Sequence, residues 1–212
     1  MLTVKSFEFS PIQENTYILY NEFNECIIID PGCYFDEEKD KMLAFIDKKK
    51  LTPKMLINTH CHLDHVFGNK FIANKYNLTL QIHENEKPVL AFATTSGLMY
   101  NLPFDNYEGE FIYLNEGEII KIGDDELMVL LTPGHSPGSI SFYSVKNKFV
   151  VSGDVLFRNS VGRSDLPGGN HETLIQSIKE KLMTLPEDTT VFSGHGLPTT
   201  IGYECRNNPY LV

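Results

Sequence analysis

Short apolar runs alternate with polar turns through the first part of the chain. The alternation of side chains over 2–9 and the strand-forming runs that follow predict a β-meander, which the Asp30-Pro31-Gly32 turn ends. Apolar residues then recur at helical spacing among charges over 36–50, which predicts an amphipathic surface helix with Asp36 as its N-cap. The predicted strands of this part are 2–9, 15–20, 26–29, 55–57 and 78–82.

The rest of the chain continues this order of strands and helices. No tandem repeat, low-complexity segment or flexible linker interrupts it. Each half places several strands before a helix, which fits the α/β class and a four-layer αββα sandwich of two face-to-face mixed sheets with helices outside. Pattern alone leaves other α/β folds open. The further predicted strands are 118–122, 126–132, 139–145, 148–152 and 190–192, and the further predicted helices are 66–76, 84–94, 171–185 and 200–207.

Residues 95–117 differ from the rest because they show neither the strand nor the helix period. They contain three glycines, a proline and five aromatic side chains. Long loops inside a compact domain are often functional, so the segment could form a wall over an active site. Its aromatic residues could equally pack down as a satellite of the core. Both interpretations stay open at this point.

The length, composition and charge of the chain limit the classes of function that it can have. At 212 residues and 42% hydrophobic content, we expect residues 1–212 to form a single domain with one substantial core. A net charge of -10 argues against a nucleic-acid partner bound through a basic surface, and the lack of an apolar run of about 20 residues argues against a membrane span. Four cysteines without a CxxC pair, and an N-terminus without a signal sequence, predict a reduced cytoplasmic protein.

The densest chemistry lies at a predicted strand-to-helix turn. His60, His62, Asp64 and His65 fall within six residues, after the strand at 55–57. Alternate side chains of an extended segment share a face, so His60 and His62 can bind one metal ion. Asp64 and His65, carried past the turn, can point toward a second. Three imidazoles and a carboxylate at this spacing favour a metal site over ordinary surface histidines.

Three further ligand-type residues each follow an apolar strand and a turn of small residues. His135 follows Thr132-Pro133-Gly134, Asp154 follows Ser152-Gly153, and His195 follows Ser193-Gly194. Glycine allows a sharp turn beside each side chain, and strand ends in layered α/β folds are where sites assemble. We therefore expect these loops to converge on one point.

The segments HCHLDH, TPGHSPGS, SGDVLF and SGHG, taken in this order, resemble the glyoxalase II branch of the metallo-β-lactamase superfamily. The resemblance implies a first metal bound by His60, His62 and His135, and a second bound by Asp64, His65 and His195. It implies that Asp154 bridges the two. The expected cofactors are two divalent metal ions, zinc first, with iron or manganese as alternatives because imidazole and carboxylate ligands accept all three.

The chemistry expected of such a site is hydrolysis of a thioester or related ester of a small molecule. A metal-bridging hydroxide would attack, with Asp64 as a ligand that also accepts its hydrogen bond. The chain ends soon after the last ligand, so we expect no C-terminal glutathione-binding helical domain, and the sequence looks most like short, single-domain glyoxalase II-like bacterial hydrolases. Arg163 and Tyr203 are candidate substrate-binding residues, although Arg163 could instead pair with Asp165.

Two other function classes remain open. Persulfide dioxygenases resemble the same segments but use a single iron, which here would be bound by His60, His135 and Asp154. A non-catalytic metal-binding role is the third. We expect His83 and His171 to have solvent-facing or capping roles, and the side chain of Cys61 to point away from the metals as a buried thiol.

Overall fold

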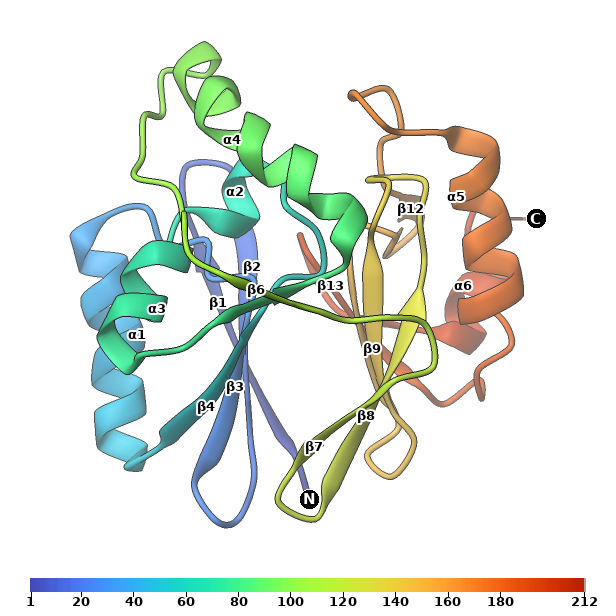
Figure 1. Ribbon diagram of the computed structural model, residues 1–212. Helices are drawn as coiled ribbons and strands as arrows, with labels where there is room; N and C mark the ends of the chain where they lie inside the picture. Colours follow the sequence, from blue (N-terminus) through green and yellow to red (C-terminus); the bar gives the residue numbers. More distant parts are fainter. Residues whose placement is uncertain (212) are drawn as a thin grey trace.

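Two six-stranded sheets face each other in the computed structural model, which describes residues 1–211 (Figure 1). The first sheet contains, in spatial order, β1 (Thr3–Phe9), β2 (Glu14–Tyr20), β3 (Glu25–Ile29), β4 (Thr52–Ile57), β5 (Leu80–Ile82) and β6 (Phe111–Tyr113). The second contains β14 (Thr199–Thr200), β13 (Thr190–Ser193), β10 (Phe149–Gly153), β9 (Ile140–Ser144), β8 (Asp125–Leu131) and β7 (Ile119–Ile122). A small hairpin joins β11 (Leu156–Phe157) to β12 (Ser160–Val161).

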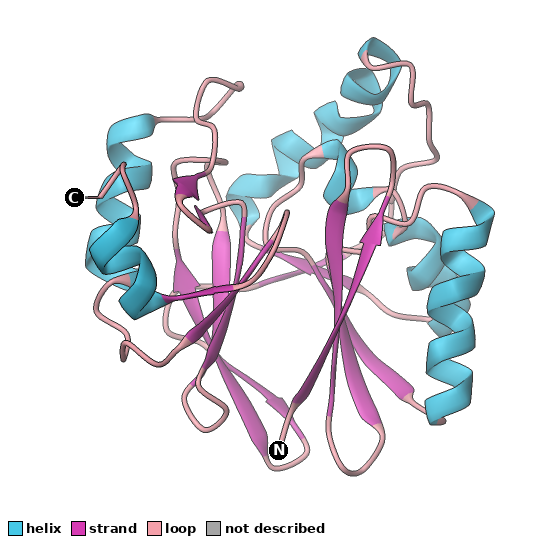
Figure 2. Cartoon of the chain, turned by 180° about the vertical axis from the view of Figure 1, so that it is seen from behind, coloured by secondary structure: helices cyan, strands magenta, loops and turns pink. Residues whose placement is uncertain are grey.

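Helices cover the outer face of each sheet, as Figure 2 shows. Those on the first sheet are α1 (Asp36–Lys49), α2 (Leu63–Val66), α3 (Asn69–Tyr76), the 3₁₀ turn η1 (Glu84–Glu86) and α4 (Lys87–Met99). Those on the second are α5 (His171–Ser177), the π-helical turn η2 (Ile178–Leu182) and α6 (Ile201–Asn207). No helix among residues 1–211 has the length and apolar character that a bilayer crossing requires.

Three apolar layers hold these elements together. The inner faces of the two sheets meet in a core that includes Ile27, Ile57 and Phe142. A second core lies between the first sheet and its helices, and a third lies between the second sheet and α5, η2 and α6. Three apolar layers between four structural layers confirm the predicted αββα sandwich.

Strand direction explains why the ligand-bearing loops gather. β3, β4 and β5 are parallel neighbours in the first sheet, as are β10 and β13 in the second, so their carboxyl ends share an edge of each sheet. In Figure 1, α2 and the β11–β12 hairpin both lie at the upper edge of the sandwich. The residues that follow β4, β10 and β13 therefore meet across the two sheets.

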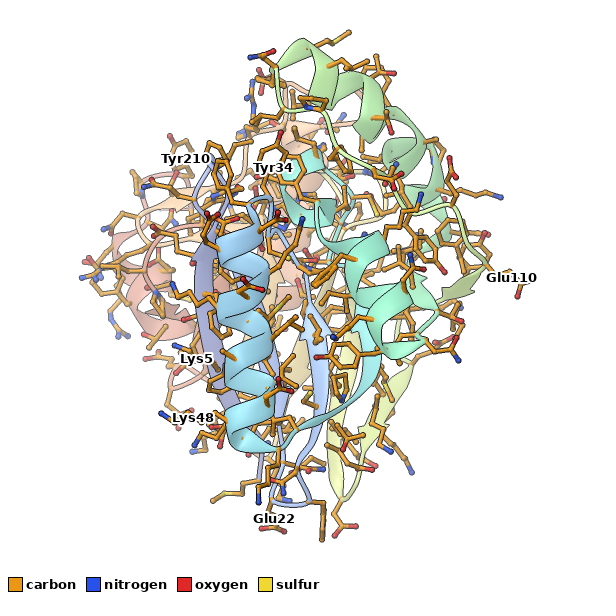
Figure 3. All side chains as sticks on the ribbon, turned by 90° about the vertical axis from the view of Figure 1, so that its left-hand side faces the viewer. Lys5, Glu22, Tyr34, Lys48, Glu110 and Tyr210 are labelled. Carbon is orange, nitrogen blue, oxygen red and sulfur yellow. The ribbon has the colours of Figure 1, made fainter. Side chains whose placement is uncertain are left out.

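The N-cap prediction for the first helix was wrong. The helix begins at Asp36 itself, and Phe35 is the N-cap. Glu38 takes over the capping role, because its carboxylate accepts hydrogen bonds from the backbone N–H groups of Tyr34 and Phe35. The helix then runs along the first sheet from near Tyr34 to Lys48 (Figure 3).

Residues 95–117 are more ordered than their pattern indicates. α4 continues to Met99, five residues past the predicted helix end, and β6 adds an edge strand at Phe111–Tyr113. Phe104, Tyr107 and Phe111 pack against the core between the first sheet and its helices. The satellite-core interpretation therefore holds for these aromatic residues. Tyr100 alone of the segment's aromatic side chains lines the depression at the ligand cluster.

Candidate metal centre

The turn after β4 is fixed by a buried carboxylate. Asp30 follows β3, and its Oδ1 accepts a hydrogen bond of 2.7 Å from the backbone N–H of Thr59. Its Oδ2 accepts another of 2.6 Å from the Thr59 hydroxyl. The turn leads directly into α2, whose short length carries Asp64 and His65 around toward the second sheet. One acid therefore fixes the backbone at Thr59, the residue directly before the HCHLDH segment.

Three imidazoles converge at the first half of the site. His135 Nε2 lies 2.8 Å from His62 Nδ1 and 3.1 Å from His60 Nε2. His135 Nδ1 lies 2.6 Å from the carbonyl oxygen of Arg163, so it donates to that oxygen and Nε2 carries the lone pair. Burial lowers the pKa of all three rings, that of His62 to about 3, and the neighbouring imidazoles add to the effect for His60 and His62. These nitrogens are therefore neutral, face a common centre and could bind a metal ion there.

The second half of the site combines carboxylates with imidazoles. Asp64 Oδ2 lies 3.2 Å from His195 Nε2 and 3.9 Å from His65 Nε2. Burial disfavours the ionised form of Asp64, but the adjacent His65 and His195 hold its pKa below the usual value. Asp64 is therefore ionised at neutral pH and could serve as an anionic ligand.

Asp154 stands between the two halves. Its Oδ2 lies 3.6 Å from His135 Nε2 and 3.6 Å from His195 Nε2, while Oδ1 lies 3.4 Å from His65 Nε2. Burial opposes ionisation here too, but the surrounding histidines lower the pKa of Asp154 well below its usual value. A carboxylate that faces both groups of ligands has the placement of a bridge.

The donor set fits metal ions better than a network of hydrogen bonds. His65 Nε2 and Asp154 Oδ1 are buried without a hydrogen-bond partner, which is costly unless a cation satisfies them. Ligand atoms lie within 4.8 Å of one another in both the His60, His62, His135 set and the Asp64, His65, His195 set. Imidazole nitrogens and carboxylate oxygens in such sets suit zinc, iron or manganese.

No sequence pattern pointed to two buried acids that lie near the candidate ligands. Glu86, at the end of η1, accepts hydrogen bonds from Cys61 N at 2.8 Å and from Gly138 N at 2.7 Å. Glu14 lies 3.9 Å from His65 Nδ1, and burial raises its pKa well above the usual value. The only hint of Asp30 was its place at the end of a predicted strand, before a Pro-Gly turn.

The remaining predicted residues fall in different places. Arg163 lines the depression at the ligand cluster, and its guanidinium makes two 2.8 Å hydrogen bonds to Asp165. Tyr203 lies apart from it, in a separate depression where Arg158 packs 5.7 Å from the ring centroid. The structure therefore brings one of the two candidate substrate-binding residues to the site.

The histidines and the cysteine set aside from the ligand set lie outside the cluster, as expected. His83 is the N-cap of η1, and its Nδ1 accepts a hydrogen bond from Asn85 N. His171 is exposed at the start of α5. Cys61 is buried in the core between the first sheet and its helices, and its side chain is part of neither ligand set.

The chain is similar to several known proteins along nearly its whole length. A family profile described as the metallo-beta-lactamase superfamily matches residues 10–195. The chain is 42% identical over 203 residues to the probable metallo-hydrolase YqgX of Bacillus subtilis, covering 95% of this chain and 93% of that protein. It is 34% identical over 213 residues to the hydroxyacylglutathione hydrolase GloC of Haemophilus influenzae, covering 99% and 98%. The crystal structure of TTHA1623 in a di-iron-bound form is similar with a TM-score of 0.88 and 35% identity, covering 98% of this chain and 100% of that one.

Proposed function

The chain belongs to the metallo-β-lactamase superfamily, and from that premise we propose that this metallo-hydrolase cleaves a thioester or related ester at a dinuclear centre. The observation that carries the proposal is the position of Asp154. Its two carboxylate oxygens face ligand nitrogens from both halves of the site, at 3.4 to 3.6 Å. A carboxylate placed between two sets of potential ligand atoms supports a bridge between two metal ions.

Each half would hold one divalent metal ion, zinc by preference, with iron or manganese as alternatives. His60, His62 and His135 would hold the first, Asp64, His65 and His195 the second, and Asp154 would contact both. Metal ions bound in this way lower the pKa of a water ligand toward ~7 and polarise a carbonyl oxygen.

The chain's own groups would direct the attack. Asp64 is buried and ionised at neutral pH, so its carboxylate can accept a hydrogen bond from the attacking water and orient it. Tyr100 and Phe157 line the same depression, of about 440 Å³, and their rings would shield the ester carbonyl from bulk water. The guanidinium of Arg163 pairs with Asp165 through two hydrogen bonds. Arg163 would therefore form part of the wall of the site rather than bind a substrate carboxylate.

The substrate partner we propose is a small molecule, and the compartment is the cytoplasm. All four cysteines are free thiols, three of them buried, which is usual where thiols are kept reduced. The relative GloC is a hydroxyacylglutathione hydrolase, which supports a thioester as the substrate.

The test measures metal content per chain after purification without added metal, together with thioester hydrolysis and persulfide-dependent oxygen uptake on the same sample. About two metals per chain, thioester cleavage and no oxygen uptake would support the proposal. One iron per chain with oxygen uptake would replace it with a dioxygenase that uses His60, His135 and Asp154. Two metals without cleavage of any ester would leave only metal binding.

Asp154→Asn provides the site-specific arm of this test. Loss of the negative charge between the two ligand sets should reduce metal content below two and lower kcat/KM by more than about 100-fold. Asp188→Asn is the matched control, because Asp188 is an exposed carboxylate paired with Lys148 on another surface. Full metal content and activity in Asp154→Asn would contradict the dinuclear assignment.

A further inference from the structure

We propose that the acyl part of the substrate is an uncharged apolar chain, bound in a groove between α4 and the Leu166-Pro167-Gly168 turn. The inference rests on the proposed ester or thioester hydrolysis and names the substrate class for it. The groove has a volume of about 580 Å³, which is within the range of small-molecule sites. Its walls come from α4, the start of η1, the Pro137 loop and that turn.

The groove opens directly onto the ligand cluster. His62, Leu63, Ser96 and Leu166 line both the groove and the depression that contains Asp64, His135, Asp154 and His195. An ester whose carbonyl sits over the metal-binding side chains can therefore extend its acyl chain into the groove without leaving the surface. This continuity separates the groove from the isolated depression at Tyr203.

The walls are apolar where a chain would lie. Val89, Phe92 and Ala93 on α4 line the groove together with Pro137 and Pro167. Phe92 is 46% exposed although it is a large aromatic residue, and it is part of this wall. Covering such a surface with a methylene chain is favourable by the hydrophobic effect.

The charges of the groove argue against an anionic acyl or thiol group. Glu84 is the one carboxylate among the residues that line it, and no lysine or arginine does so. His62 adds no positive charge, because burial lowers its pKa to about 3. The adjoining depression adds Arg163, but Asp165 occupies that guanidinium through two hydrogen bonds. A glutathione-like group carries two carboxylates, and the only guanidinium that the two depressions offer it is that of Arg163, which already pairs with Asp165. An uncharged chain meets no such penalty.

The floor of the groove is held in place before any ligand binds. Cys61 lines it, and the fully buried Glu86 joins the backbone of Cys61 to that of Gly138, next to the lining residue Pro137, through hydrogen bonds. Proline residues at 88, 137 and 167 stiffen the walls. A preformed apolar groove binds a chain without the cost of ordering loops.

The test is a series of S-acyl-N-acetylcysteamine thioesters from acetyl to decanoyl, which vary only in the uncharged chain. We expect kcat/KM to rise by roughly two- to fourfold per methylene until the groove is full. We also expect S-lactoylglutathione to be a poorer substrate than the octanoyl thioester. The same kcat/KM for acetyl and octanoyl, or a preference for the glutathione thioester, would overturn the inference while leaving the proposed hydrolysis intact.

A matched pair of variants on one helix tests the location. Phe92→Glu places a charge in the groove wall, so it should cost the octanoyl thioester at least about tenfold more than the acetyl thioester. Leu98→Glu is the control, since Leu98 is 65% exposed on α4 and is not among the groove-lining residues. It should leave both substrates unchanged. Equal losses for the two acyl lengths in Phe92→Glu would contradict the groove assignment.

Binding of an uncleavable analogue separates this inference from the proposed function. Calorimetry with the S-octyl thioether of N-acetylcysteamine should show binding more than about tenfold tighter than with the S-ethyl thioether. Binding that depends on the length of the alkyl chain, without hydrolysis of any thioester, would contradict the proposed function and support the groove assignment. Thioester hydrolysis with equal affinity for the two thioethers would contradict the groove assignment alone.

Discussion

Asp30 Oδ2 lies 3.1 Å from His65 Nδ1, and both side chains are buried. The carboxylate is therefore placed to accept the Nδ1 proton, which leaves the Nε2 lone pair of His65 directed at Asp64 and Asp154. The same carboxylate fixes the backbone of Thr59 next to His60. One acid thus orients a proposed ligand of each metal, although it is part of neither three-residue set assigned to them.

Asp30→Asn should lower zinc affinity by about 10–100-fold, the usual effect of removing a carboxylate partner from a ligating histidine. The variant amide loses the charge, and its NH₂ group would face the Nδ1–H of His65. The measurement is a competition titration against a chromophoric chelator. Asp188→Asn, an exposed carboxylate paired with Lys148, should keep wild-type affinity. Equal affinity in both variants would show that Asp30 does not orient the ligands.

Glu86 ties the HCHLDH turn to the loop of His135. Its Oε2 accepts from Cys61 N, and its Oε1 accepts from Gly138 N and the Ser136 hydroxyl. Glu86→Gln replaces one acceptor oxygen with a donor, so a buried N–H or hydroxyl loses its partner. We expect about 1–3 kcal/mol lower free energy of unfolding in urea. Glu84→Gln, at an exposed position of the same turn, should stay within about 0.5 kcal/mol of wild type.

Gly194 leaves no space beside the proposed bridge. A Cβ atom there would lie 2.0 Å from Asp154 Oδ1 and 2.8 Å from His65 Cε1. Gly194→Ala should therefore displace one of these side chains and reduce the metal content measured by atomic emission. Gly196→Ala is the control, because its Cβ would meet open space and only its φ of +72° is unfavourable, at about 1 kcal/mol. Two metals in purified Gly194→Ala would show that the cluster tolerates the shift.

The sequence predicts the parts of this protein that local pattern controls. Each proposed ligand loop follows an apolar strand and a turn with its own signal, so the convergence of His135 and Asp154 on the HCHLDH turn could be expected. The partner acids could not, because Asp30 is 35 residues from His65 and Glu86 is 50 from Ser136. Such pairs depend on strand register and helix placement, which no local pattern encodes.

The end of α4 was missed for a related reason. Thr94, Thr95, Ser96 and Gly97 have low helix propensity, and so pattern ended the helix at 94. In the fold, Gly97 lets the helix pack closely against Leu102 and Phe104, where a Cβ would lie only 2.7 Å from the Leu102 carbonyl oxygen. Tertiary packing therefore overrides the local preference.

The two ligand sets should lose metal at different pH values, because their histidines titrate in opposite directions. Burial lowers the pKa of His60, His62 and His135, so few protons compete for those nitrogens until the solution is strongly acidic. Burial also opposes protonation of His65, but Asp154 and Asp64 raise its pKa well above the usual value. His195 follows the same pattern through its hydrogen bond to Asp64. A raised pKa means that protons compete at higher pH.

As the pH falls, metal should therefore leave the Asp64, His65, His195 set before it leaves the His60, His62, His135 set. Equilibrium dialysis against buffered zinc from pH 8 to pH 4 should show two steps, from two metals per chain to one and then to none. His195→Ala should remove the step at higher pH, and His62→Ala should remove the step at lower pH, because each variant deletes a ligand from one set only. A single step in the wild-type protein, or the opposite assignment of the two steps, would contradict the conclusion that Asp64 and Asp154 raise the pKa of His65.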